Sequence, residues 1–207
     1  MVVLDEVQTL KFEKPEGIIG GLKGYLANGR LTRGGLYELA SDCGLVLLAN
    51  IALDERQRPM ASPLVSELPY FLRETAFLDR IRGIVPGWEV RKLTSNCFAS
   101  SIGLKSDFFG DALIAMRDDL YADQQCEQRV RLKGEKAYKR NEEAVRAIAS
   151  GLIKILFPNG KFTDTELYRY CVEPARKLRQ LVWNQLYEMG AEYHQFDRFL
   201  ECDLDPC

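Results

Sequence analysis

A chain of 207 residues has room for one large domain or two small ones, and its 46% hydrophobic and 28% charged residues are ordinary for a globular protein. The formal net charge of −2 provides no overall basic field for nucleic acid, although a local basic patch is compatible with it. Six cysteines without a CxxC pair and a single histidine exclude zinc-finger spacings, and they favour reduced thiols over a disulfide framework. The longest apolar stretch is too short to span a membrane and no signal-peptide pattern opens the sequence, so we expect a cytoplasmic protein without a membrane partner.

The first ten residues carry the pattern around which the rest of the chain is interpreted. Residues 1–4 are apolar, as in a fully buried strand of a parallel sheet, and Asp5 and Glu6 follow directly. Acids at this place lie at the carboxyl end of the strand, where open α/β sheets bind ligands. An Asp there can hold Mg²⁺ and a neighbouring Glu can orient or deprotonate an attacking water, which is the form of a Walker B segment. A strand end that carries two solvated acids is the alternative.

A helix and a turn separate this strand from a second one. Pro15 suits the first helical position, apolar residues recur at helical spacing after it, and Gly29 suits the end of the helix. Residues 30–35 are expected to form a loop or a hairpin tip. Residues 44–49 form the second apolar strand, which ends on Asn50, whose amide offers a donor and an acceptor together.

The remaining sequence changes from mixed to helical patterns. Residues 70–81 have the apolar spacing of a helix, and residues 83–90 are broken by glycine and proline as in a strand or extended segment. Further helices are expected at residues 106–121, 141–157, from a capping box at Thr163 and Glu166 to a kink at Pro174, and 175–189.

A basic stretch at residues 129–140 contains Glu135 as its only acid. Such a run is compatible with a solvated helix face and with a nucleic-acid patch.

The order of these segments resembles the second half of AAA+ ATPases, which runs from Walker B through sensor 1 and an arginine finger to a helical lid with sensor 2. The resemblance narrows to the Lon-like AAA+ proteins of BREX phage-defence systems, the BrxL family. Its most specific block is TAFLDRIRGIVPGWE at residues 75–89. Further similar segments are residues 22–34, 47–51, 150–158 and 185–193.

The resemblance implies roles for an acid pair and an amide. Asp5 is expected to hold the Mg²⁺ of ATP, Glu6 to polarise the attacking water, and Asn50 to sense the γ-phosphate and hold that water. Without the family context, an amide that caps a strand end explains Asn50 equally well.

The resemblance also implies roles for arginines. Arg80 is expected to be the finger that reaches the ATP of a neighbouring subunit, with Arg82 as the second choice; a salt bridge between Arg80 and Glu74 or Asp79 is the alternative. Arg179 is the sensor 2 candidate and Arg176 its alternative. These roles imply a homo-oligomeric ring, and the family implies DNA and other BREX components as partners.

The sequence departs from the family where the phosphates are expected to bind. It contains no P-loop, GxxxxGK followed by Ser or Thr, because its one Gly-Lys pair, Gly160 and Lys161, precedes Phe162. Of the AAA+ strand order 5-1-4-3-2, the chain is expected to supply only strands 3, 4 and 5, at residues 2–4, 45–49 and 84–85. We therefore expect an amino-terminally truncated piece that, alone, neither binds ATP well nor hydrolyses it.

The expected fold class is α/β, a partial AAA+ core with parallel strands 3-4-5 at residues 1–104, followed by an all-helical lid subdomain at residues 105–207. The expected function is a segment of a Lon-like AAA+ ATPase that hydrolyses ATP in a ring acting on DNA. The alternatives are a non-catalytic binding or assembly fragment that keeps the subunit interface and the lid, and an unrelated α/β fold in which Glu6 and Asn50 never converge.

Overall fold

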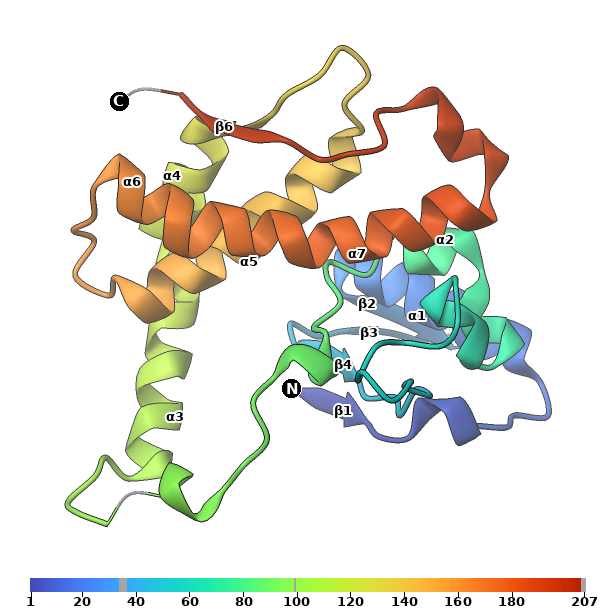
Figure 1. Cartoon of the computed structure of the whole chain (residues 1–207), viewed down its shortest axis with the longest axis horizontal. Helices are drawn as coiled ribbons and strands as arrows, with labels where there is room; N and C mark the ends of the chain where they lie inside the picture. Colours follow the sequence, from blue (N-terminus) through green and yellow to red (C-terminus); the bar gives the residue numbers. More distant parts are fainter. Residues whose placement is uncertain (34–36, 99, 206–207) are drawn as a thin grey trace. The chain divides into compact units, whose positions relative to one another are not determined.

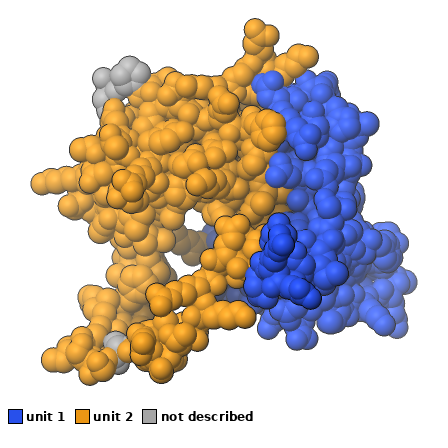
Figure 2. Space-filling view, in the orientation of Figure 1, with its two compact units in different colours: residues 1–81, 182–198 blue, residues 82–181, 199–207 orange. Residues whose placement is uncertain are grey.

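The structure is a computed structural model that describes residues 1–33, 37–98 and 100–205. It divides into two compact units, each built from segments far apart in the sequence (Figure 2). Unit 1 comprises residues 1–81 and 182–198, and unit 2 comprises residues 82–181 and 199–207. Helix α7 (Glu173–Met189) contributes residues to both units. The expected boundary between an α/β subdomain at residues 1–104 and a helical lid at residues 105–207 stays a prediction.

Unit 1 contains the predicted pair of parallel strands. Strand β1 (Val2–Leu4) pairs with β4 (Leu45–Leu47) in parallel, with Val2 opposite Leu45 and Leu4 opposite Leu47 (Figure 1). The expected full burial of the first strand is wrong, since Val2 and Val3 remain 47% and 45% exposed. This parallel sheet has only two strands in the described chain, so its faces are not covered as those of larger parallel sheets are.

The segment between these two strands follows its local signals. Helix α1 (Pro15–Asn28) begins at the predicted proline and ends at Gly29, which has a left-handed φ of 71°. A Cβ at Gly29 would lie 2.8 Å from the carbonyl oxygen of Ser41, so glycine also suits the close approach of the next segment. Strands β2 (Arg30–Arg33) and β3 (Tyr37–Ala40) form the expected hairpin, while residues 34–36 at its predicted tip lie outside the described residues.

The predicted helix over residues 70–81 is two shorter segments. A 3-10 helix η3 (Tyr70–Arg73) and helix α2 (Thr75–Leu78) are separated by Glu74, whose extended ψ of 125° ends the first. The apolar side chains expected to be buried there are buried: Phe71, Leu72, Phe77 and Leu78. The apolar pattern therefore identified the buried side but not the break.

Other short 3-10 helices complete unit 1. They are η1 (Val7–Thr9), η2 (Leu64–Glu67) and η8 (Ala191–Gln195). The last turns of α7 close this core, because Trp183 is fully buried and its indole N–H donates to the Asp197 carbonyl at 3.0 Å.

Unit 2 is mainly helical, with one small sheet that the sequence did not predict. Its elements in chain order are η4 (Gly87–Glu89), η5 (Ser95–Cys97), α3 (Ser106–Ala115), η6 (Met116–Asp118), α4 (Leu120–Arg129), β5 (Val130–Leu132), α5 (Lys139–Leu156), α6 (Asp164–Leu167), a π-helical turn η7 (Tyr168–Val172), α7 and β6 (Cys202–Leu204). Strands β5 and β6 are antiparallel, so the expectation of an all-helical region is wrong.

The expected strand at residues 84–85 is also absent among the described residues. The N–H of Ile84 donates to the Leu178 carbonyl in α7 at 3.1 Å, which withdraws it from strand pairing. The preceding Gly83 packs so tightly that a Cβ would lie 3.0 Å from Leu178 and 3.1 Å from Ile148. These contacts within unit 2 hold the segment as an extended connection instead.

The basic stretch at residues 129–140 includes strand β5, and basic side chains in and next to this strand form ion pairs. Arg131 lies 3.2 Å from the carboxylate of Asp205, and Lys133 lies 3.0 Å from that of Asp203 in β6. The pairing with Lys133 lowers the pKa of Asp203, and hydrogen bonding to Asp203 raises the pKa of Lys133. This part of the basic stretch is therefore a paired surface, as the solvated-face interpretation expects.

The core of unit 2 contains three free thiols. Burial raises the pKa of Cys126 to about 12, of Cys171 to about 11 and of Cys202 to about 12. A thiol with such a pKa stays protonated at neutral pH, so these cysteines act as small apolar side chains. Across the described residues, the helices are all too short or too polar to cross a membrane.

The region around Pro174 combines a confirmed start with an unexpected continuation. Thr163 and Glu166 form the predicted capping box, in which the Glu166 carboxylate accepts from the Thr163 N–H and hydroxyl, each at 2.8 Å. Beyond it, α6 passes through the π-helical turn directly into α7. Pro174 lacks an N–H, and a π-helical turn is one way for a helix to continue past such a position.

The capping box gives a stability prediction. Thr163→Ala removes the hydroxyl that accepts from the Glu166 N–H, so we expect the free energy of unfolding to fall by about 1 kcal/mol in urea titrations followed by circular dichroism. Hydrogen bonds from Thr163 also lower the pKa of Glu166. The contribution of this carboxylate is therefore complete above the unfolded-state pKa and is lost as the pH falls through the lower folded-state pKa.

The matched control is Thr165→Ala, in the same turn, which we expect to change stability by less than about 0.5 kcal/mol. A Thr163→Ala effect that equals the control, or that does not shrink in acid, would contradict a working capping box.

Candidate functional site

The carboxyl ends of β1 and β4 lie at the same edge of their sheet. Asp5 and Glu6 follow β1, and Asn50 lies three residues beyond β4. Backbone hydrogen bonds continue past both strands, since Leu48 N–H donates to Leu4 O at 2.8 Å and Val7 N–H donates to Leu48 O at 3.0 Å. The structure therefore brings together the acid pair and the amide on two adjoining segments, and all three side chains are exposed.

The pairing slips by one residue at Glu6. In a regular parallel ladder, Leu48 would donate to Leu4 and accept from Glu6. Leu48 accepts from Val7 instead, so Glu6 is an extra residue, as in a β-bulge. Bulges are frequent beside functional sites because they change the direction of a side chain.

Glu6 has a left-handed backbone, with φ 49° and ψ 43°. This conformation is unfavourable for a residue with a Cβ by about 1–2 kcal/mol. Local bonds hold it: Glu6 N–H donates to Asp5 Oδ1 at 2.8 Å, and Glu6 O accepts from the N–H and the hydroxyl of Thr9 at 2.9 and 2.8 Å. Strain that the surroundings enforce in this way is common at functional sites.

A side chain that the sequence did not single out connects the two strand ends. The Asn50 N–H donates to Oε1 of Gln8 at 3.2 Å. Gln8 lies in η1, whose first residue Val7 is buried. Gln8 could not be recognised from the sequence, because its partner is 42 residues away and a glutamine after an acid pair has no specific pattern.

The donor atoms at this edge suit a hard cation. Asp5 and Asn50 carry oxygen donors, which Mg²⁺ prefers, and their strands bring them to one edge. Among the described residues, no group of three or more His, Cys, Asp and Glu side chains is placed to hold a metal ion. A cation bound through one or two carboxylates and substrate phosphates does not require such a group.

Arg80 follows α2 in unit 1 and is half-buried. Its guanidinium donates from Nη1 to the Ala76 carbonyl one turn earlier, and its buried Nε has no hydrogen-bond partner among the described residues. Of the two acids in the salt-bridge alternative, Glu74 and Asp79, Glu74 has its ion pair with Lys23, at 2.6 Å.

The other arginine candidates belong to unit 2. Arg82 is exposed, whereas Arg179 in α7 is fully buried and donates from Nε to Oδ1 of Asn141 at 2.7 Å. Arg176 pairs with Glu173 at 2.6 Å. Asn141 was also missed by the sequence analysis, because a buried asparagine in the first turn of a helix resembles a surface one in sequence.

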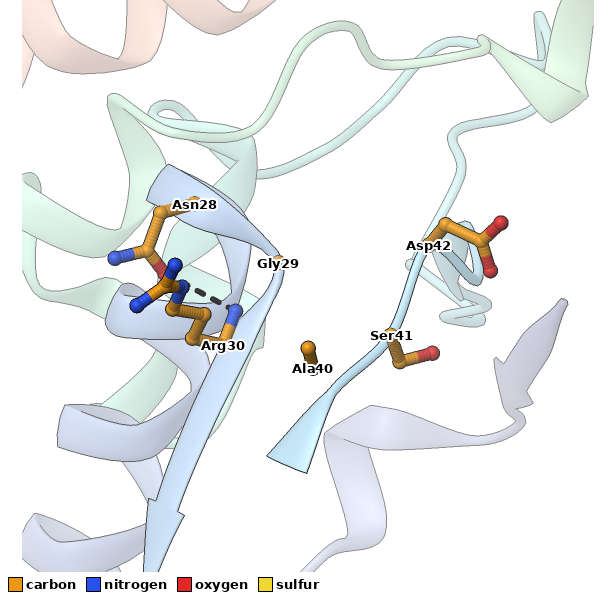
Figure 3. Close-up of a pocket in the computed structure, with 6 residues that line it drawn as sticks. All are labelled: Asn28, Gly29, Arg30, Ala40, Ser41 and Asp42. Atoms are coloured by element: carbon orange, nitrogen blue, oxygen red, sulfur yellow. Dashed lines mark hydrogen bonds between the residues drawn. The ribbon is translucent and has the colours of Figure 1, made fainter. Parts of the chain in front are cut away.

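An open pocket elsewhere in unit 1 does not contain the predicted site residues. It lies where α1 ends and the hairpin closes, between Asn28 and Arg30 on one side and Ser41 and Asp42 on the other (Figure 3). Its residues are occupied in holding the hairpin: Arg30 N–H donates to Asn28 Oδ1 at 3.0 Å, and Ser41 N–H donates to Gly29 O at 2.8 Å.

The left-handed backbone at Glu6 gives a prediction about stability. Glu6→Gly removes the Cβ that makes this conformation unfavourable, so the free energy of unfolding should rise by about 0.5–1 kcal/mol in urea titrations. Gln57 has the same type of backbone, with φ 59°, and Gln57→Gly should stabilise by a similar amount. If Gln57→Gly stabilises the chain and Glu6→Gly does not, the strain at Glu6 is contradicted.

Comparison with known proteins identifies the family of the chain. Residues 1–198 match the family model described as Lon-like protease BrxL-like, ATPase domain. Lon-like protease BrxL of Escherichia coli O9:H4 (strain HS) is 29% identical over 190 residues, 92% of this chain and 27% of the relative. Lon-like protease BrxL of Bacillus cereus (strain H3081.97) is 31% identical over 193 residues, 91% of this chain and 27% of the relative.

The chain thus spans about a quarter of the length of the curated relatives it matches. Because the family model covers nearly all of its sequence, the chain belongs to the family of Lon-like, BrxL-like protease ATPase domains.

Proposed function

We propose that this chain supplies the metal-holding, water-orienting and γ-phosphate-sensing part of an ATP hydrolysis site in a Lon-like AAA+ ATPase. The observation that carries the proposal is the junction of two parallel strand ends, where Asp5 and Glu6 adjoin the segment that bears Asn50. Open α/β sheets bind ligands at this edge. The membership of an ATPase-domain family supports ATP as the ligand.

Each of the three side chains has a role that its chemistry allows. Mg²⁺, when bound, supplies positive charge against the phosphate oxygens. One oxygen of the Asp5 carboxylate accepts from the Glu6 N–H, and its second oxygen would hold the ion. Glu6 accepts a proton from, or orients, the attacking water, and Asn50 donates to the γ-phosphate while its carbonyl holds that water.

Arg80 is proposed to act on the ATP of a neighbouring subunit in a homo-oligomeric ring, with Arg82 as the second choice. Its bond to Ala76 holds the guanidinium against its own helix, and exchange of that neutral carbonyl for an anionic phosphate oxygen would add the attraction between opposite charges. Arg179 remains the candidate for the sensor 2 arginine of the helical lid. Its burial and its bond to Asn141 mean that a role at phosphate requires a rearrangement of its surroundings.

The wider setting is proposed from the family. The names of the relatives describe Lon-like proteases. For this chain we propose a role in BREX phage defence, action on DNA and contact with other BREX components. The basic stretch at β5 gives them limited support, because Arg131 and Lys133 are already paired with acids.

In this proposal the triphosphate of ATP is bound by a P-loop, which these 207 residues do not contain. A direct test therefore places this chain beside one. In a chimera, the chain replaces the matched segment of the Bacillus cereus relative, and phosphate release from ATP is measured with Mg²⁺. We expect turnover, and we expect Glu6→Gln to lower kcat by about 10²–10⁴-fold with ATP binding retained, because general base catalysis contributes that much.

Glu13→Gln is the matched control, an exposed glutamate seven positions later in the chain, and it should leave kcat unchanged. A chimera that hydrolyses ATP equally well with and without the Glu6 carboxylate would refute the assignment. A chimera that assembles and binds ATP but does not turn it over would count against the proposed function as a whole.

A further inference from the structure

The bond between Gln8 and Asn50 replaces one that the sheet would otherwise make. After the bulge, the bond from the Val7 N–H to the Leu48 carbonyl sets a register in which the Asn50 N–H would donate to the Val7 carbonyl. The Val7 carbonyl accepts from the Leu10 N–H at 3.2 Å instead, and the Glu6 carbonyl accepts from the N–H and hydroxyl of Thr9. Oε1 of Gln8 takes the place of the Val7 carbonyl, at 3.2 Å from the Asn50 nitrogen.

We propose that Gln8 is a positioning residue: its bond to the Asn50 backbone N–H fixes the segment that carries the Asn50 side-chain amide beside the strand end that carries Glu6. This inference rests on the proposed function, because the position of Asn50 matters for catalysis only if Asn50 and Glu6 act on the same γ-phosphate. The bulge turns Glu6 out of the ladder and would by itself leave the Asn50 backbone without an acceptor. The side chain of Gln8 supplies the missing acceptor for the Asn50 N–H. The turn η1 therefore both fixes the backbone direction at Glu6 and holds the backbone of Asn50.

The anchoring of Gln8 supports this role. Val7, directly before it, is 1% exposed and donates to Leu48 O at 3.0 Å. Thr9, directly after it, is fixed by its two bonds to Glu6 O. The backbone of Gln8 is thus held on both sides, and little freedom is lost when its side chain bonds Asn50.

The structural part of the inference is tested on the chain itself. Amide hydrogen exchange is followed by NMR on ¹⁵N-labelled chain with Gln8→Ala, Gln8→Glu and a control, Gln124→Ala, at an exposed glutamine of α4. Loss of a neutral hydrogen bond of about 1 kcal/mol corresponds to about a fivefold change. We expect Gln8→Ala to accelerate exchange at Asn50 about fivefold and to leave Leu48 unchanged, with Gln8→Glu restoring protection because it keeps the acceptor.

The catalytic part is tested in the chimera described above. Gln8→Ala should lower kcat about three- to tenfold with the KM for ATP unchanged, and Gln8→Glu should recover most of the loss. A residue that only stabilised the sheet end would lower thermal stability and move Leu48 and Asn50 exchange together.

The outcomes separate the two claims. Unchanged Asn50 exchange in Gln8→Ala, or equal acceleration at Leu48, overturns the positioning role whatever the activity. A selective change at Asn50 without any change in kcat also overturns it. If Asn50 exchange responds but Glu6→Gln is fully active, the contact stands and the proposed function fails.

Discussion

The parallel pairing of β1 with β4 is the constraint on which the candidate site depends. Parallel strands end at the same edge of a sheet, so a short register from Val2 opposite Leu45 to Leu4 opposite Leu47 decides which later residues can meet. A slip of one residue would exchange the faces of every side chain beyond it. The two backbone bonds through Leu48 extend this register past the strands and carry it to the acid pair.

Past the strands, the chain departs from regular geometry at the residue with the most demanding proposed chemistry. Glu6 adopts a left-handed backbone that glycine or asparagine would adopt more easily. The surrounding turn compensates through bonds from Thr9 and from the buried neighbour Val7. Local backbone strain that neighbouring residues enforce is frequent at functional sites. A functional requirement on the direction of the Glu6 side chain would explain why a glutamate occupies this left-handed position.

The features that sequence predicted are those written in local residues. Pro15 and Gly29 identified both ends of α1, and the capping box at Thr163 identified the start of α6. The features it missed depend on distant partners or on neutral residues. Ile84 was expected in a strand but bonds Leu178 in α7, and Gln8 bonds Asn50, which lies beyond the end of a different strand, 42 residues away. The acid pair and the amide lie at one edge, as expected from two apolar runs that each end in polar residues, although that pattern is common in sequences without a shared site. The bulge could not be predicted, because a glutamate does not indicate a left-handed backbone.

The central claim is that the two strand ends form one site for a divalent cation and the phosphate it accompanies. Paramagnetic broadening by substoichiometric Mn²⁺ tests it most directly when the ion is added with ATP to the chimera that supplies the P-loop, with the amides of the present chain labelled with ¹⁵N. The effect falls steeply with distance from the ion, and Mn²⁺ accepts the oxygen ligands of Mg²⁺. The account predicts selective loss of amide signals at residues 5–7 and 48–50, including the Asn50 side chain, and recovery of those signals in Asp5→Asn. Broadening confined to one strand end, or located elsewhere on the chain and unaffected by Asp5→Asn, would contradict it.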